Sequence, residues 1–325
     1  MTEPLRVGIF STAKINDAIL DGAREAAGAE VVAVASRDRD RAQAYAAEKR
    51  IPRAYGSYED LLADQAVEAV YVPLPNSLHL PWAERALEAG KHVLCEKPLS
   101  RRAADVEAAF DVAEGAGRIL MEGFMWRYHP ATAKVVSLVE GGAIGRLRIV
   151  RAAFAFMLDP AADNVRWSGE LEGGALMDVG CYCVSALRLF AGEPERVSAE
   201  RVEGADGVDA RLAGLLRFDG DVLGTFDCGF DVPYRAGIEL VGETGTIVSL
   251  DPWHGRKPGV RILRADAEPE DVPVEAANPY ARELDDLARA VREGGEPRLG
   301  RADAVGQARA LASLYAAADA GSRAV

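Results

Sequence analysis

Residues 91–100, KHVLCEKPLS, decide the fold of the first part of the chain. The apolar run at 92–95 lies between two helix-like segments, which is typical of a buried strand in a parallel sheet. The carboxyl ends of such strands face the crevice where open α/β sheets bind ligands. Pro98 restricts Lys97 to extended backbone angles and is itself a candidate for a cis peptide bond. The stretch therefore predicts a lysine that is held rigidly at a ligand crevice.

Strands and helices alternate on both sides of this stretch. The predicted strands are residues 5–10, 31–35, 67–72, 92–95 and 118–121, with predicted helices ending near residues 27, 48, 89 and 114. Such alternation predicts an α/β domain built on a doubly wound parallel sheet.

The pattern changes after Glu122. Several strand-like runs, such as 208–218 and 222–228, follow one another without helices between them. This predicts an α+β domain with a large, mostly antiparallel sheet and helices on one face. Helices at 279–292 and 302–320 close the chain. The predicted domains are residues 1–123 and 124–325.

The composition limits the kinds of partner. Among 325 residues, 38 Lys and Arg face 51 Asp and Glu, which gives a net charge of −13. This balance argues against nucleic acid or an anionic membrane as the main partner, although a local arginine can still bind an anionic ligand. The chain has no apolar run of signal-peptide or membrane-spanning length, and its four cysteines lack metal-ligand spacing. We therefore expect a cytoplasmic protein without a metal site.

The turn after the first strand, GIFSTAKIN at 8–16, is the natural phosphate site. Ser11, Ala13 and Asn16 stand where a dinucleotide loop G-x-G-x-x-G has its glycines. Small residues with free N–H groups satisfy the same physical need, but an ordinary strand–helix turn with an N-cap explains the turn equally well. The candidate phosphate contacts are Ser11, Thr12, Ala13, Lys14 and Ile15.

The end of the second strand bears on the choice of cofactor. Ser36 stands where NAD sites commonly have an acidic residue, and Arg37 and Arg41 suit a 2′-phosphate. This favours NADP over NAD. The alternatives are that both arginines are solvated surface charges and that Asp38 reaches the ribose, which keeps NAD open.

Two further segments flank the predicted crevice. Pro73, Leu74, Asn76 and His79 follow the third predicted strand, where Asn76 also suits a helix N-cap and His79 can be a plain helix residue. Glu96 precedes Lys97 at the end of the fourth.

The hinge WRYHP at 126–130 is expected at an interdomain cleft, with packing as the alternative role of its aromatic residues. The following helix, GGALMDVGCYCVSAL at 173–187, has Asp178 and Tyr182 four residues apart on one face. A carboxylate in a largely buried helix is either functional or paired, so pairing of Asp178 with a structural arginine remains the alternative.

With the Glu-Lys-Pro turn, the WRYHP hinge and the GGALMDVGCY helix in this order, the sequence resembles the Gfo/Idh/MocA oxidoreductases. It is most similar to the branch with glucose-fructose oxidoreductase, trans-dihydrodiol dehydrogenase and NADP-dependent xylose dehydrogenase. The resemblance implies an N-terminal Rossmann domain that binds the dinucleotide. It also implies a C-terminal domain for substrate binding and oligomerisation, whose sheet forms homodimers or homotetramers. The implied reaction moves a hydride between NAD(P) and a sugar or polyol.

The resemblance also implies roles for single residues. Tyr182, where many members have histidine, would take the hydroxyl proton with help from the Lys97 ammonium, because an ordinary tyrosine pKa of ~10 is too high for a base at neutral pH. Asp178 would orient the substrate or Lys97. The implied cofactor contacts include Glu96, Lys97, Trp126 and Arg127, and the implied substrate contacts are Lys97, Arg127, Trp167, Asp178 and Tyr182.

Two other functions remain as alternatives. A non-catalytic NADP-binding sensor or scaffold would keep the fold without turnover, but it would have no need of Lys97, Asp178 and Tyr182 together. A redox-neutral, NAD-dependent glycoside hydrolase of the same family would retain its cofactor and show no net absorbance change.

Overall fold

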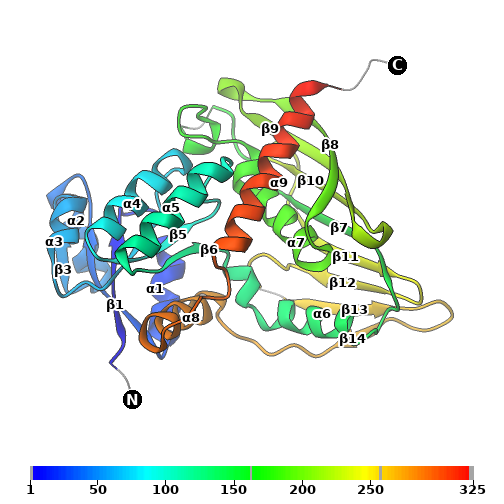
Figure 1. Ribbon diagram of the computed structural model, residues 1–325, viewed down its shortest axis with the longest axis horizontal. Helices are drawn as coiled ribbons and strands as arrows, with labels where there is room; N and C mark the ends of the chain where they lie inside the picture. Colours follow the sequence, from blue (N-terminus) through cyan, green and yellow to red (C-terminus); the bar gives the residue numbers. More distant parts are fainter. Residues whose placement is uncertain (1–2, 162, 256–257, 322–325) are drawn as a thin grey trace. The chain divides into compact units, whose positions relative to one another are not determined.

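The computed structural model describes residues 3–161, 163–255 and 258–321, and the chain divides into two compact units (Figure 1). The first unit comprises residues 1–125 and 278–305, and the second comprises 126–277 and 306–325. None of the helices within the described ranges is both long and apolar enough to cross a lipid bilayer.

The first unit is built on a parallel sheet in the order β3-β2-β1-β4-β5-β6. Its strands are β1 (Leu5–Phe10), β2 (Ala29–Ala35), β3 (Arg53–Tyr55), β4 (Ala69–Val72), β5 (His92–Glu96) and β6 (Leu120–Gly123). Its helices are α1 (Asn16–Glu25), α2 (Arg39–Lys49), α3 (Tyr58–Ala63), α4 (His79–Glu88), α5 (Ala103–Ala116) and α8 (Pro279–Glu293). The doubly wound sheet predicted from the sequence is confirmed. The sequence missed β3 and α3, because three and six residues are too few for a clear periodic pattern.

Helix α8 packs on α1 in the first unit, although the sequence assigned it to the domain 124–325. A Cβ atom on Gly22 of α1 would lie 2.6 Å from the Cβ of Tyr280, so only glycine allows this close approach. Asp285 of α8 also accepts a hydrogen bond of 2.7 Å from the Gly28 N–H. This return of the chain depends on long-range packing, which a local sequence pattern does not reveal.

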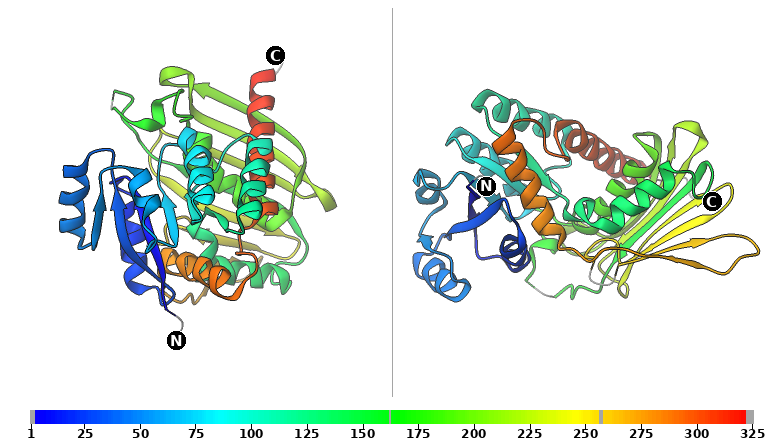
Figure 2. Two further views of the ribbon diagram at one scale, coloured as in Figure 1. Left: turned by 60° about the vertical axis from the view of Figure 1, so that its left-hand side comes forward. Right: turned by 90° about the horizontal axis from the view of Figure 1, so that it is seen from below.

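The second unit contains a sheet in the order β14-β13-β12-β11-β7-β10-β9-β8. Its strands are β7 (Leu147–Ala155), β8 (Pro194–Glu203), β9 (Asp209–Phe218), β10 (Leu223–Gly229), β11 (Arg235–Gly242), β12 (Thr246–Leu250), β13 (Gly259–Leu263) and β14 (Glu270–Val272). Strands β7 and β10 pair in parallel, and the other neighbours pair antiparallel. Helices α6 (Pro130–Glu140), α7 (Cys181–Ala191) and the part of α9 (Arg301–Ala320) in this unit cover one face (Figure 2). The predicted α+β architecture is confirmed.

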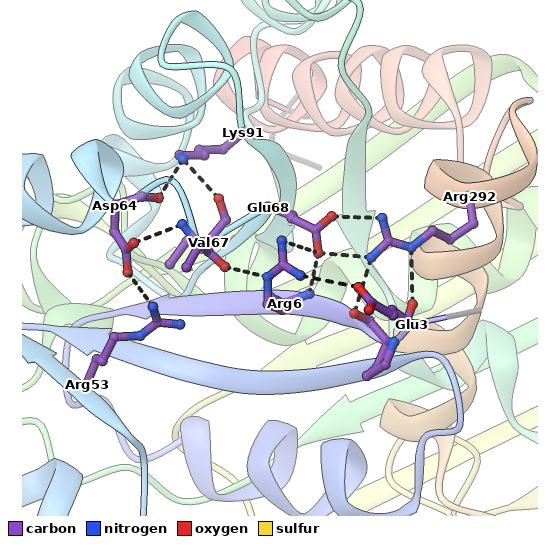
Figure 3. A network of polar contacts seen from close by, with 10 residues as sticks. Glu3, Arg6, Arg53, Asp64, Val67, Glu68, Lys91 and Arg292 are labelled. Carbon is purple, nitrogen blue, oxygen red and sulfur yellow. Dashed lines mark hydrogen bonds and ion pairs between the residues drawn. The ribbon is translucent and has the colours of Figure 1, made fainter. Parts of the chain in front are cut away.

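An ion-pair network fastens α8 to the start of the first sheet (Figure 3). Arg292 binds the carboxylate of Glu68 through two hydrogen bonds of 2.8 and 2.9 Å. The Arg6 N–H donates to the same carboxylate at 3.1 Å, and the Arg292 guanidinium also donates to the carbonyls of Glu3 and Pro4. The Glu68 side chain is only 23% exposed, so the network is protected from much solvent screening.

Lys91, the first residue of the stretch that decides the fold, lies on the other side of this network (Figure 3). Its ammonium donates to the carbonyls of Asp64 and Val67 at 2.8 and 2.9 Å. Burial lowers the pKa of Lys91, although the Asp64 carboxylate partly opposes this. The Asp64 carboxylate itself pairs with Arg53 of β3 at 3.1 Å. The loop 64–67, just before β4, is therefore bound both to β3 and to Lys91, which directly precedes β5.

We expect Glu68→Gln to lower the free energy of unfolding at pH 7 by about 1.5–3 kcal/mol, the usual contribution of hydrogen bonds to a charged group. Arg292 is the largest cause that lowers the pKa of Glu68 from its ordinary value of 4.5. A lowered folded-state pKa contributes stability that is complete above the unfolded-state pKa and is lost as the pH falls through the folded-state value. Urea unfolding should therefore show the two proteins converging below about pH 4.5.

The control variant is Glu243→Gln, which removes the exposed partner of Arg148 and should leave unfolding nearly unchanged. Equal effects of the two substitutions at pH 7 would contradict a special role for the Glu68 network.

Candidate functional site

The predicted cofactor residues of the first unit lie at one edge of its sheet, because each group follows the carboxyl end of a parallel strand. Residues 11–15 follow β1, 36–41 follow β2, 73–79 follow β4, and 96–97 end β5. Strand β1 pairs with both β2 and β4, so the chain order reverses at this point. Ligands of open α/β sheets bind at such a reversal. The structure thus brings these predicted residues together.

The turn after β1 has serine in the backbone position that glycine normally takes. Ser11 has a φ of +62°, in the left-handed region. Its hydroxyl accepts from the Ala13 N–H at 3.3 Å, and the Asn16 amide donates to its carbonyl at 3.0 Å. Helix α1 has Ile15 at its N-cap position and no side-chain cap, unlike the ordinary capped turn that the sequence left open.

The turn after β2 separates a capping residue from two exposed arginines. The Asp38 carboxylate accepts from the Arg41 N–H at 3.1 Å and caps α2, and the Ser36 hydroxyl accepts from the Asp38 N–H at 3.3 Å. Asp38 is thereby engaged within its own turn. The side chains of Arg37 and Arg41 are both exposed, as binding of an external anion requires.

His79 joins the segment after β4 to the turn that follows Lys97, where the Lys97–Pro98 peptide is cis as the sequence suggested. It is 1% exposed, and its ring nitrogens lie 2.8 Å from the Pro98 carbonyl and 2.7 Å from the Leu74 carbonyl. A neutral imidazole has one N–H, and which of the two carbonyls accepts it depends on the tautomer. Asn76 begins a short 3₁₀ helix and does not cap α4, because that turn intervenes.

A half-buried acid, Glu96, and a buried acid, Glu122, hold the backbone on both sides of Lys97, whose side chain is half-buried. Glu96 accepts from the Tyr71 hydroxyl at 2.6 Å, and Glu122 of β6 accepts from the Leu99 N–H at 2.9 Å. Burial and, next, the Glu96 charge raise the pKa of Tyr71 well above its usual value. The Lys97 backbone is therefore tied to both neighbouring strands.

In the second unit, Asp178 lies on one π-helical turn, Leu176–Gly180, that leads into α7. Its carboxylate accepts from Arg166 Nε at 2.5 Å, and the two side chains are 17% and 40% exposed. The structure therefore contains the arginine pairing that the sequence kept as an alternative. Arg166 was missed as a site residue, although it is the only basic residue between 156 and 173. Turns of π-helix inside helices are frequent at functional sites.

The two glycines before this turn have separate steric reasons. A Cβ on Gly173 would lie 2.3 Å from the Arg166 carbonyl oxygen, which accepts the Gly174 N–H at 2.9 Å. Gly174 has a φ of +107°, and a Cβ there would lie 2.3 Å from Asp209 Oδ1. The helix can start here only because both side chains are absent.

Asp209 of β9 anchors the start of the helix. It is 1% exposed and accepts from the Leu176 N–H at 2.6 Å and the Tyr315 hydroxyl at 2.8 Å. Burial raises the pKa of Asp209, and these hydrogen bonds oppose the increase. An acid at a helix N-terminus is electrostatically favourable. No pattern in the sequence pointed to Asp209, because its partners come from distant elements.

An aromatic cluster of Trp126, Phe154 and Trp253 holds the Tyr182 ring, which is 6% exposed. Phe154 and Trp253 contact the Tyr182 ring at centroid distances of 5.4 and 5.8 Å. Trp126 is 1% exposed and packs edge-to-face on Trp253 at 5.4 Å. The predicted residue Trp126 therefore has a packing role within this unit.

The remaining predicted residues of this unit lie around the same helix. Arg127 donates to the Ser185 hydroxyl of α7 at 3.3 Å. Trp167 is 6% exposed, packs on Phe230 at 5.4 Å and donates to the Asp159 carbonyl at 3.0 Å. Of the two, Arg127 therefore contacts α7 directly, whereas the Trp167 N–H is already used within its own segment.

Within the described ranges, no group of three or more His, Cys, Asp and Glu side chains is arranged to hold a metal ion. The reversal-point edge of the first unit, with its small-residue turn and exposed arginines, is typical of a dinucleotide-dependent oxidoreductase. Residues 5–124 match the oxidoreductase family with an NAD-binding Rossmann fold, and residues 132–248 match the GFO/IDH/MocA C-terminal domain. The chain belongs to the Gfo/Idh/MocA family of oxidoreductases, which confirms the resemblance seen in the sequence.

Individual relatives resemble the chain over nearly its whole length. It is 41% identical to D-xylose 1-dehydrogenase (NADP(+)) 2 of Haloferax volcanii, with 97% of each protein covered. It is 37% identical to a dTDP-3,4-didehydro-2,6-dideoxy-alpha-D-glucose 3-reductase of Streptomyces violaceoruber, covering 90% of this chain and 86% of the reductase. The crystal structure of KijD10, a 3-ketoreductase from Actinomadura kijaniata with NADP and TDP-benzene, superposes with a TM-score of 0.90 at 33% identity, covering 97% and 98% of the two chains.

We expect Gly174→Ala to lower the melting temperature strongly and to reduce activity, because the added Cβ would displace the Asp209 carboxylate. The matched control is Gly142→Ala, where φ is +74° and a Cβ would meet no atom within 4 Å. The control isolates the backbone penalty of about 1–2 kcal/mol. Thermal unfolding of the two variants would contradict the steric argument if Gly174→Ala were no less stable than Gly142→Ala.

Proposed function

We propose that the protein is an NADP-dependent dehydrogenase or reductase of a sugar or related polyol, with Tyr182 as its acid–base group. One observation carries the proposal: a phenol and a carboxylate, Tyr182 and Asp178, are each held in place, four residues apart, in a chain of this oxidoreductase family. The names of its relatives, a xylose dehydrogenase and a deoxysugar 3-reductase, support a sugar substrate.

NADP supplies or accepts the hydride. The backbone of Ser11, Thr12, Ala13, Lys14 and Ile15 binds the pyrophosphate, supported by the uncapped start of α1. Arg37 and Arg41 bind the 2′-phosphate, since both are exposed and Asp38 is engaged as a helix cap. The NADP named for the relatives points the same way.

The other proposed cofactor contacts follow β4 and β5. Pro73, Leu74, Asn76 and His79 shape the segment after β4, and the His79 bonds to two carbonyls keep that segment and the Lys97 turn together. Glu96, Lys97 and Arg127 complete the cofactor contacts, and Trp126 acts through its packing.

The chain's residues handle the proton. In the oxidative direction the Tyr182 phenolate would accept the O–H proton of the substrate as its carbonyl forms, and bound NADP⁺ would supply the acceptor for the hydride of the broken C–H bond. The Lys97 ammonium stabilises the phenolate and the developing alkoxide. Asp178, Arg127 and Trp167 orient the substrate. The Arg166 ion pair supports this role, because it keeps the Asp178 carboxylate in a defined orientation.

We also propose a homodimer or homotetramer formed through the open face of the eight-stranded sheet. This face carries exposed apolar side chains on β9, β10 and β12, with Leu215, Leu223 and Leu250 being 48%, 39% and 44% exposed. Cross-strand ion pairs such as Arg151–Glu239 lie among the strands of the sheet and neutralise charge in an acidic chain. Such a surface suits self-association.

We expect Tyr182→Phe to lower kcat by about 10²–10⁴-fold, the usual contribution of a positioned acid–base group. The phenyl ring keeps its contacts with Phe154 and Trp253, so the fold should be unchanged. The measurement is the absorbance change of the nicotinamide with NADP⁺ and a panel of aldoses, inositols and anhydro-sugars.

The control is Tyr55→Phe, which removes a phenol that donates to Asp64 in the first unit and should leave kcat unchanged. Near-normal turnover of Tyr182→Phe would exclude Tyr182 as the acid–base group. A wild-type protein that binds NADP but converts no member of the panel would point to a non-catalytic sensor, and cofactor retention without net absorbance change would point to a redox-neutral hydrolase.

We expect Arg37→Ala to lower kcat/KM for NADP⁺ by about tenfold or more, because it removes charge-assisted hydrogen bonds to the 2′-phosphate, and to leave NAD⁺ little changed. The matched control is Arg50→Ala, which removes another arginine just after α2 and should not alter the ratio. An equal loss with both cofactors would contradict recognition of the 2′-phosphate by Arg37.

A further inference from the structure

Asn16 stands where a glycine-rich dinucleotide loop has its third glycine, yet its side chain is completely buried. It is the first residue of α1 and is 0% exposed. Its Nδ2 donates to the Ser11 carbonyl at 3.0 Å. This bond fixes the orientation of the amide, because a carbonyl oxygen only accepts hydrogen bonds. Asn16 therefore holds the turn after β1 from inside the protein.

The bond to Asn16 orients the peptide that joins Ser11 and Thr12. The carbonyl of a trans peptide and the N–H of its next residue point in opposite directions, so the Thr12 N–H points away from the buried Asn16. N–H groups presented in this way beside a helix N-terminus bind phosphate. We propose that Asn16 is a positioning residue for the pyrophosphate of NADP and acts through this peptide, an inference that rests on the proposed binding of the cofactor by this turn.

Ser11 needs a contact that holds it, because its φ is +62°. This left-handed backbone is unfavourable for a residue with a Cβ, and glycine-rich loops avoid the cost. Strained residues at ligand sites persist only where their surroundings hold them. The Ser11 hydroxyl accepts from the Ala13 N–H at 3.3 Å, which is long for such a bond. The shorter bond from the buried Asn16 is therefore the stronger restraint on the serine.

The other end of the Asn16 amide argues against a purely structural role. Its Oδ1 is buried and makes no hydrogen bond within the described ranges. Burial raises the pKa of the neighbouring Tyr45 hydroxyl and Asn16 opposes the increase, but the two groups complete no hydrogen bond. A buried acceptor without a partner is destabilising. An apolar residue would suit this position better if the donor to Ser11 served no purpose.

Helix α2 holds the first turn of α1 in place around Asn16. The Lys49 ammonium pairs with the Asp17 carboxylate at 2.7 Å and lies 5.7 Å from the centroid of the Tyr45 ring. Tyr45 and Lys49 are four residues apart on α2, so both face the start of α1. The residue that restrains Ser11 is thus itself supported by a second helix.

The test measures NADP⁺ binding by titration calorimetry in the absence of any sugar, for Asn16→Ala in the wild-type chain and in a Ser11→Gly chain. In the wild-type chain the Kd should rise about tenfold, which corresponds to the loss of one good hydrogen bond. Glycine adopts a positive φ without help, so in the Ser11→Gly chain the same substitution should raise the Kd less than about threefold. A general loss of stability would not depend on the residue at position 11 in this way.

The matched control is Asn278→Ala, which removes the N-cap of α8 in the same unit. It should lower the melting temperature and leave the Kd for NADP⁺ unchanged. If Asn16→Ala does not fold, Asn16→Asp keeps the size of the side chain and suits a helix N-terminus, but it loses the donor. Its added charge acts equally in both chains, so a smaller rise in the Ser11→Gly chain still supports the inference.

No rise in the Kd of the wild-type chain, or an equal rise in both chains, overturns the role of Asn16. A Kd that responds as expected in a protein that oxidises or reduces no sugar supports the inference and contradicts the proposed function. Loss of NADP⁺ binding in Arg37→Ala but not in Asn16→Ala overturns the inference and leaves the proposed cofactor site intact.

Discussion

The hydrogen bond from the Leu176 N–H to the buried Asp209 carboxylate sets where the helical segment that leads into α7 begins. The backbone before it is confined between the Arg166 carbonyl and Asp209, and only glycine fits at 173 and 174. The start of a helix determines which faces its later side chains occupy. The directions of Asp178 and Tyr182 therefore depend on this one contact and on the absence of two side chains.

Two kinds of interaction hold these side chains in different ways. Asp178 is held by an ion pair with the half-exposed Arg166, so the strength of this ion pair varies with salt. Tyr182 is held by aromatic packing against Phe154 and Trp253, which does not depend on ionic strength. Added salt should therefore loosen the Asp178 carboxylate and leave the Tyr182 ring in place.

In the first unit, several hydrogen bonds likewise fix a predicted site residue, at the edge of the sheet where the parallel strands end. The turn with Lys97 is tied by Glu96, Glu122 and His79 to elements on either side. Each of these bonds is made by a buried or half-buried group, where an unmade bond is expensive. At the opposite end of the same sheet, just before β4 begins, Glu68 forms a bidentate ion pair with Arg292 of α8 (Figure 3). The strands are thus held at both ends.

The sequence by itself determined the α/β architecture, the strand ends that Ser11, Ser36 and Lys97 follow, and the four-residue spacing of Asp178 and Tyr182. These follow from strand and helix periods and from motifs that are local in the chain. Only the tertiary structure decided the pairing of Asp178 with Arg166, the anchoring of the helix by Asp209 and the return of α8 to the first unit. Each joins elements through side chains whose meeting depends on how the chain folds back, and local periodicity does not encode which distant carboxylate, arginine or aromatic ring will meet.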